Sequence, residues 1–212
     1  MSESAPSTAR PSDRLVDAAT EVLAEDGWEG LTLQAVAARA GVSRVTVWRQ
    51  ATSRELLAAE MINRLAVDYR ETLWPILTGP GTGAERLGAA LAAMCDVADR
   101  HLPLLLASDS AFRQSHAEVM HAVGFTEPIV RLIRDGVADG SIAGPADPAA
   151  LGDVVFNATY WPYIHLRGRH RWSARDARAM LLPLIQGGIR EVARAGAPAA
   201  SRPAEPAAGS AP

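Results

Sequence analysis

The sequence predicts an all-α protein, and three observations lead to that prediction. Apolar residues recur at helical spacing between breaks made by glycine and proline. No run alternates apolar and polar residues between turn signals, as a half-buried strand would, and no internal repeat is visible. The chain has 212 residues, of which 48% are hydrophobic, so it can bury a substantial core. We therefore expect helices to account for all of the regular structure.

The first predicted helix begins at Asp13, after a segment rich in serine, proline and alanine. Residues 1–12 are expected to form a disordered arm. The inward positions of the helix follow the spacing i, i+3, i+4, i+7 and i+8: Leu15, Ala18, Ala19, Val22 and Leu23. Gly27 stands where a C-terminal cap would end this helix.

Two short helices are predicted to follow. Thr32 is an N-cap candidate for LQAVAARA, which Gly41 ends, and Ser43 is a cap candidate for RVTVWRQ. Two short helices joined across a glycine, with an earlier helix to pack on, are the ingredients of a helix-turn-helix. If Val47 faces inward, Arg44 and the other outward residues of RVTVWRQ are free to contact solvent or a groove.

The rest of the chain is predicted to be helical up to a disordered tail. A long helix should begin after Ser53 and end near Pro75. Gly140 and the GPADP sequence should interrupt the chain between later helices. The tail has no apolar side chain larger than alanine. The further helices are expected at about 84–99, 102–107, 115–138, 147–166 and 173–195, and the tail is expected at 196–212.

Charge is unevenly distributed along the chain. The formal net charge is −3, which argues against general attraction to a polyanion. No acidic residue occurs between Glu29 and Glu55, although four arginines lie there: Arg39, Arg44, Arg49 and Arg54. This local excess of positive charge fits either a solvated basic surface or a short helix that contacts an anionic partner.

Several other classes of protein are disfavoured. The longest apolar run, LPLLLA, is too short to span a membrane, and the N-terminus lacks the apolar segment of a signal peptide, so we expect a soluble, cytoplasmic protein. The single cysteine, Cys95, cannot form an internal disulfide and is expected in the core. Glu118 and His121 form one Glu-x-x-His pair without the second pair that a di-iron site needs. We expect no catalytic residue, metal or cofactor.

Most of residues 13–57 resembles the tetracycline-repressor (TetR) family of bacterial transcription regulators. The resemblance rests on an ordered set of residues: Gly27-Trp28, Leu31-Thr32, Val36-Ala37, Ala40-Gly41-Val42-Ser43, Thr46-Val47-Trp48, Ser53-Arg54-Glu55 and Leu57. A weaker likeness, in LIRDGVADGSI followed by Asp-Pro and two long helices, extends it to the C-terminal half. It implies a DNA-binding domain at 13–57 and an effector-binding and dimerisation domain at 58–195.

The resemblance also implies which residues contact DNA. It assigns phosphate contacts to Thr32, Thr46, Trp48 and Arg54. Groove or backbone contacts fall to Ser43, Arg44, Val45, Arg49 and Gln50. The chemistry agrees, because arginine suits guanine or phosphate, and a glutamine amide can read adenine. The chain departs from the family pattern at Trp48, where tyrosine is usual, at Ala51, where an aromatic residue is usual, and at Arg54, where lysine is usual.

An effector site is expected in the core of the C-terminal domain. Bulky apolar side chains with a few neutral polar groups typify a ligand pocket. The predicted lining residues are Met94, Phe112, Met120, His121, Phe125, Asn157, Tyr160 and Trp161. No cluster of charge in this region would hold a strongly ionic ligand, so we expect a small, largely apolar effector.

The preferred function is a ligand-responsive repressor that binds a palindromic double-stranded DNA operator as a homodimer. Dimerisation is expected in the last two helices, whose apolar positions exceed the needs of one core face: Val154, Val155, Leu181, Leu182, Leu184, Ile185 and Ile189. One alternative is a helical enzyme or carrier for an apolar small molecule, without DNA binding. Another is a helix-turn-helix used only for protein contacts.

Overall fold

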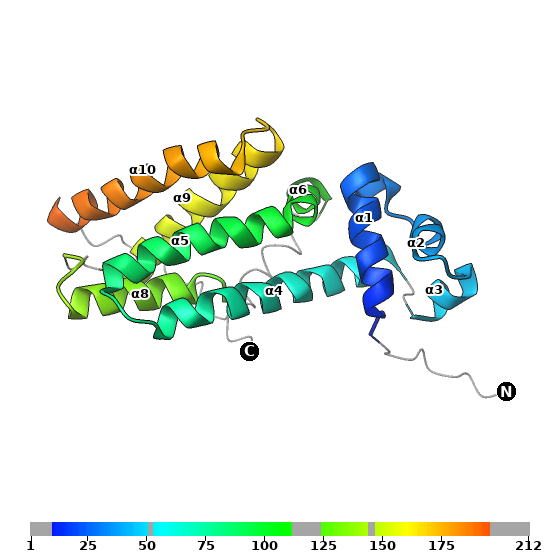
Figure 1. Cartoon of the computed structure of the whole chain (residues 1–212), viewed down its shortest axis with the longest axis horizontal. Coiled ribbons are helices and arrows are strands. Elements are labelled where there is room, and N and C mark those ends of the chain that lie inside the picture. The colour runs from blue at the N-terminus through cyan, green and yellow to red at the C-terminus, as the bar shows by residue number, and fades with distance from the viewer. Residues whose placement is uncertain (1–9, 51–52, 112–123, 144–146, 196–212) are drawn as a thin grey trace, which may run out of the picture.

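The computed structural model describes residues 10–50, 53–111, 124–143 and 147–195, and every regular element in these ranges is a helix. This confirms the predicted fold class. A small unit at one end contains three helices, and α4 leads from it along a larger bundle (Figure 1). The small unit comprises α1 (Asp13–Gly30), α2 (Leu33–Ala40) and α3 (Arg44–Gln50).

The larger bundle is layered. In Figure 1, α4 and α8 form its lower side, α5 lies above them, and α9 and α10 form the opposite side. The helix α6 follows α5 and packs against α1, so it joins the bundle to the small unit. The bundle consists of α4 (Arg54–Thr78), α5 (Gly83–Arg100), α6 (Leu102–Ala111), α8 (Glu127–Ala138), α9 (Pro148–Gly168) and α10 (Ala174–Ala195).

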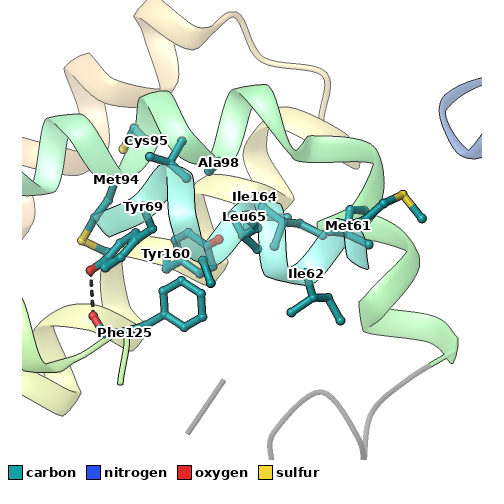
Figure 2. Packing of buried hydrophobic residues seen from close by; sticks show 14 of the residues in the cluster. Met61, Ile62, Leu65, Tyr69, Met94, Cys95, Ala98, Phe125, Tyr160 and Ile164 are labelled. Carbon is teal, nitrogen blue, oxygen red and sulfur yellow. Dashed lines mark hydrogen bonds between the residues drawn. The ribbon is translucent and has the colours of Figure 1, made fainter. Parts of the chain in front are cut away.

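The core of the bundle is apolar and continuous with that of the small unit. Figure 2 shows Tyr69 of α4 beside Met94 of α5, with the Tyr69 hydroxyl donating a hydrogen bond of 2.7 Å to the carbonyl oxygen of Phe125. That bond ties the segment before α8 to the middle of α4. Cys95 is buried, as predicted, and burial raises the pKa of its thiol to about 12.

Local capping chemistry sets both ends of α2 as predicted. The Thr32 hydroxyl oxygen accepts a hydrogen bond of 3.1 Å from the backbone N–H of Ala35 at the start of α2. Gly41 ends α2 in the left-handed conformation, with φ 62° and ψ 38°. Gly27 interrupts α1 with φ 68°, and one further turn then extends to Gly30.

Several predicted boundaries were wrong. The first helix was expected to end at Gly27 but ends at Gly30, and the helix expected at 102–107 extends to Ala111. The long helix does not end near Pro75 but continues to Thr78, because Ile76 and Leu77 pack against the core and offset the hydrogen bond that proline removes. The helix expected at 115–138 is not continuous: Gly124 has φ 68°, the chain turns there, and α8 begins only at Glu127. The first part of that expected helix lies outside the described residues.

Ionic contacts join helices that are distant in sequence. Arg64 of α4 contacts the carboxylates of Asp13 and Asp17 on α1, at 2.8 Å and 2.5 Å. The helix α4 also crosses the expected domain boundary at residue 57 without a break. Its N-terminal part therefore belongs to the small unit and the remainder to the bundle. Among the described residues, no helix combines the length and the apolarity needed to cross a membrane.

Candidate nucleic-acid interface

The short helix α3 is fixed at its start and along its inner side. The Ser43 hydroxyl oxygen accepts a hydrogen bond of 3.1 Å from the backbone N–H of Thr46, and the two hydroxyl oxygens lie 2.9 Å apart. Val47 is fully buried, and Val42 packs partly against the same core. The cap and the buried valine hold α3 against α2 in one orientation, which confirms that Val47 faces inward.

The other side of α3 faces solvent. Val45 is 71% exposed and Trp48 is 66% exposed, and the side chains of Arg44 and Arg49 are also exposed. Two apolar and two cationic side chains therefore share the outward face of a seven-residue helix. A helix of this kind fits the major groove of DNA, where arginine can contact guanine or phosphate and a valine can contact the methyl group of thymine.

The arginines of the locally basic segment differ in their partners. Arg39 on α2 forms ion pairs with Glu21 and Glu25 of α1. No carboxylate of the described residues pairs with Arg44 or Arg49. The charge available to an anionic partner is thus concentrated on α3, and Arg39 serves to hold α2 against α1.

The residues that flank α3 are partly engaged within the protein. The Thr32 side chain is exposed although it caps α2, and Arg54 at the start of α4 stacks on the Trp28 ring, 4.6 Å from its centroid. Thr46 is half-buried and remains accessible at the edge of α3.

Gln50 departs from its predicted arrangement. Its side chain is half-buried, and its amide oxygen is buried without a hydrogen-bond partner among the described residues. In this conformation the amide does not present the paired donor and acceptor that recognition of adenine requires.

Three of the predicted effector residues come together in the bundle core. Met94, Phe125 and Tyr160 are buried near one another between α4, α5 and α9 (Figure 2). The Tyr160 ring stacks on Phe156 at 5.2 Å and meets the half-buried Trp161 edge-on at 5.8 Å. The Tyr160 hydroxyl is buried without a hydrogen-bond partner among the described residues, and burial raises its pKa, so it stays protonated.

Trp161, which was also predicted, meets this group at Tyr160, whereas Asn157 does not join it. Asn157 is exposed, and its side-chain amide donates a hydrogen bond of 2.8 Å to the backbone oxygen of Asp153 in its own helix. Phe156 and Tyr160 occupy the inward face of α9, so Asn157, which directly follows Phe156, points away from the core. Phe112, Met120 and His121 lie outside the described residues.

Sequence reasoning missed two residues that belong to these sites. Phe156 supports the Tyr160 ring, and its helical spacing four positions earlier is the signal that identifies it. Trp28 supports Arg54, which lies 26 positions later in the sequence, and no local pattern signals that contact.

A cavity of about 700 Å³ opens elsewhere in the bundle. It lies between α5, α10 and the segment after α8, and it is lined in part by Gly88, Ile142, Gln186 and Arg190. No predicted effector residue that the structure describes is among its lining residues. Within the described residues, no group of histidine, cysteine, aspartate and glutamate side chains is arranged to hold a metal ion.

Known protein structures share this fold. A transcriptional regulator of the TetR/AcrR family from Thermobifida fusca is 24% identical, with a TM-score of 0.68 over 84% of this chain and 97% of that one. The transcriptional regulator FadR from Bacillus subtilis, solved in complex with stearoyl-CoA, is 17% identical, with a TM-score of 0.70 over 83% and 98%. The fatty acid degradation regulator FadR from Bacillus halodurans is 18% identical, with a TM-score of 0.70 over 84% and 95%.

Sequence comparison identifies the DNA-binding part. Residues 15–61 match a family model described as bacterial regulatory proteins, tetR family. No curated protein sequence matches the chain. The matched segment contains α1 to α3 and the first part of α4, which is the unit that presents the outward face of α3. Residues 15–61 are therefore a DNA-binding domain of the tetR family, and the fold of the described chain is similar to that of TetR-family transcriptional regulators.

Proposed function

We propose that this regulator is a repressor that binds operator DNA as a homodimer and releases it when a small, largely apolar effector enters the C-terminal bundle. The tetR-family match at residues 15–61 and the similar fold of a TetR/AcrR-family regulator support a DNA-binding regulator rather than an enzyme. The observation that carries the proposal is the outward face of α3, where Arg44 and Arg49 have no carboxylate partner among the described residues.

In the proposed complex α3 lies in the major groove. Arg44, Val45 and Arg49 face the base edges or the flanking backbone, and Thr32, Thr46, Trp48 and Arg54 contact phosphates. The indole N–H of Trp48 can donate to a phosphate oxygen but cannot accept. Gln50 contributes to base reading only if its side chain turns outward when DNA binds.

The outer faces of α9 and α10 support the proposed dimer. Val154 is 63% exposed, Met180 is 58% exposed and Leu184 is 70% exposed, which is a high exposure for large apolar side chains on adjacent helices. Side chains built at Gly187 and Gly188 would meet no atom of the chain within 4 Å, so a partner helix can approach closely there. A two-fold dimer of this kind would place two copies of α3 about 34 Å apart, or a multiple of that distance.

Part of the predicted dimer surface lies inside the subunit instead. Val155, Leu181 and Ile189 are buried within their own chain, and Leu182 and Ile185 are half-buried. We therefore restrict the proposed interface to the exposed residues of the two helices.

The proposed effector contacts Tyr160. Its protonated hydroxyl lies in an apolar core and lacks a partner among the described residues, so it would donate a hydrogen bond to a neutral acceptor on the ligand. A strongly ionic ligand would need a countercharge in this core. A relative in fold, FadR from Bacillus subtilis, was solved with stearoyl-CoA, which supports a ligand with an apolar chain as the first class to test.

Release of DNA follows from linkage. If the effector weakens DNA binding by a given factor, DNA must weaken effector binding by the same factor. The packing of α6 against α1 provides a physical connection between the bundle and the small unit.

The test is a titration of labelled DNA from the region upstream of this protein's own gene, at fixed salt, with and without candidate ligands. Fatty acids and their CoA esters should release the DNA, while matched short-chain compounds should not. Tyr160→Phe should retain DNA binding and require more ligand for release. If the only compounds that caused release were metal ions or multiply charged metabolites without a long apolar chain, the proposed pocket would be wrong.

A further inference from the structure

Trp28 and Arg54 meet although they come from opposite ends of the DNA-binding unit. Trp28 lies in the last turn of α1, directly after the interruption at Gly27, and Arg54 is the first residue of α4. The guanidinium carbon of Arg54 lies 4.6 Å from the centroid of the Trp28 ring. This is the distance of a cation–π contact.

The indole is a firm support for the arginine. Trp28 is half-buried and packs against the apolar core, and its carbonyl oxygen accepts a hydrogen bond of 3.2 Å from the backbone N–H of Leu31. The ring therefore belongs to the folded unit rather than to a freely moving side chain. A flat guanidinium can stack on an aromatic face while its donors point outward from the edges.

The donors of Arg54 are only partly used. Its Nε donates a hydrogen bond of 3.1 Å to a carboxylate oxygen of Glu55. No described residue accepts a hydrogen bond from the two terminal amino groups, and the side chain is 37% exposed. Stacking on one face and a bond at Nε thus fix the plane of the group and leave its outer edge available.

We propose that Trp28 is a positioning residue for DNA binding, which holds the Arg54 guanidinium so that its two terminal amino groups meet one backbone phosphate. The inference rests on the proposed DNA-binding surface.

A phosphate contact is independent of base sequence, so the test needs no knowledge of the operator. We would measure the affinity of the full chain for a labelled duplex of arbitrary sequence at several salt concentrations. The variants are Trp28→Leu, Trp28→Phe, Arg54→Ala and the double variant Trp28→Leu with Arg54→Ala. Trp74→Leu is the matched control, because Trp74 is 66% exposed on α4, within the part that runs along the bundle.

Arg54→Ala should lower the slope of log affinity against log salt by about one. Trp28→Leu should weaken binding about two- to fivefold, Trp28→Phe should weaken it less, and Trp74→Leu should leave it unchanged. In the Arg54→Ala background, the change Trp28→Leu should have no further effect. Thermal unfolding of each variant identifies any loss of folding.

Two results would overturn the inference while leaving DNA binding intact. One is a Trp28→Leu variant that binds as tightly as wild type. The other is an equal loss of affinity with and without Arg54, which would show that Trp28 acts only on the fold. Absence of any salt-dependent binding by the wild-type chain would instead refute the DNA-binding surface itself.

Discussion

Single residues on α3 divide between the fold and the surface. Val47 is fully buried while Val45, two positions earlier, is 71% exposed, so two identical side chains have opposite environments. The difference follows from helical geometry, because residues two positions apart do not share a helix face. The buried valine orients the helix, and the exposed one stands beside Arg44 and Arg49.

At this scale we predict the effect of Arg44→Ala. The variant should fold and assemble as wild type does, because Arg44 is exposed and has no ion-pair partner among the described residues. Loss of a bidentate base contact should cost about 1–3 kcal/mol of discrimination between DNA sequences. The measurement is DNA affinity at fixed salt for the upstream sequence and for a scrambled one. Arg134→Ala, an exposed arginine on α8, is the control that removes the same charge.

If Arg44→Ala changed neither affinity nor sequence preference, Arg44 would not be a base contact. An equal loss with both duplexes would show instead that Arg44 contacts phosphate.

The role of a residue was predictable from the sequence when its contacts were with residues close to it in the sequence. Thr32, Gly41 and Ser43 act through neighbours within a few positions, so their caps follow from sequence alone. The positions of Gln50 and Asn157 depend on which way a polar side chain turns at a partly exposed site. Helical spacing does not determine that choice: in the structure the Gln50 amide oxygen is buried, and Asn157 is exposed rather than in the core.

At the scale of elements, one carboxylate holds three helices of the bundle together. Asp99 of α5 accepts hydrogen bonds of 2.6 Å each from the Tyr163 hydroxyl, from Arg167 on α9 and from Arg178 on α10. Burial by itself raises the pKa of Asp99, but these three donors outweigh it and hold the pKa below the ordinary value. The network fixes α9 and α10, and thus the proposed dimer face, on α5.

We predict that Asp99→Asn destabilises the fold by about 1–3 kcal/mol at neutral pH, because two arginines lose a charged acceptor. Since the folded-state pKa is depressed, the stabilisation by Asp99 is fully present above the unfolded-state pKa of about 4 and is lost as pH falls through the folded value. Thermal unfolding from pH 7 to pH 3 should therefore show the difference between wild type and variant narrowing below about pH 4.

The control for this prediction is Glu71→Gln, which neutralises an exposed carboxylate on α4. It should have little effect at any pH. A difference between wild type and Asp99→Asn that stayed constant into acid would contradict the assigned role of the ionised carboxylate.

The order and extent of the elements were largely predictable, and the errors have physical causes. Apolar spacing and capping residues identified most helices to within a few residues. The helix α4 continues past Pro75 because Ile76 and Leu77 pack against the core. This packing depends on the tertiary structure, so the local sequence did not predict it. The turn at Gly124 was missed because an isolated glycine is compatible with either a helix or a break.

At the scale of the whole molecule, the exposed apolar face of α9 and α10 is the surface on which the proposed dimer rests. How α9 and α10 lie beside one another depends on contacts between distant segments. Only the family resemblance allowed this arrangement to be predicted from the sequence. The packing of α6 against α1 also depends on contacts between distant segments, and no local sequence pattern predicted it.

We predict that Leu184→Glu converts the proposed dimer to a monomer. A charge in the centre of an apolar interface would be buried without a partner, which costs several kcal/mol. Sedimentation should show a single-subunit mass, while Val137→Glu, a charge placed at an exposed valine on α8, should leave the assembly unchanged. A dimer that persisted in Leu184→Glu would place the interface elsewhere on the molecule.

The most direct test of the central claim, that the outward face of α3 reads DNA for this regulator, is a competition measurement on the upstream DNA. Wild-type protein at physiological salt is bound to the labelled upstream duplex and displaced with an unlabelled duplex of the same composition but scrambled sequence. The account predicts that at least a thousandfold excess of the scrambled duplex is needed, about the lower limit for specific recognition. It also predicts that Arg44→Ala reduces this excess. Displacement by an equal amount of scrambled duplex, for wild type and variant alike, would contradict the account.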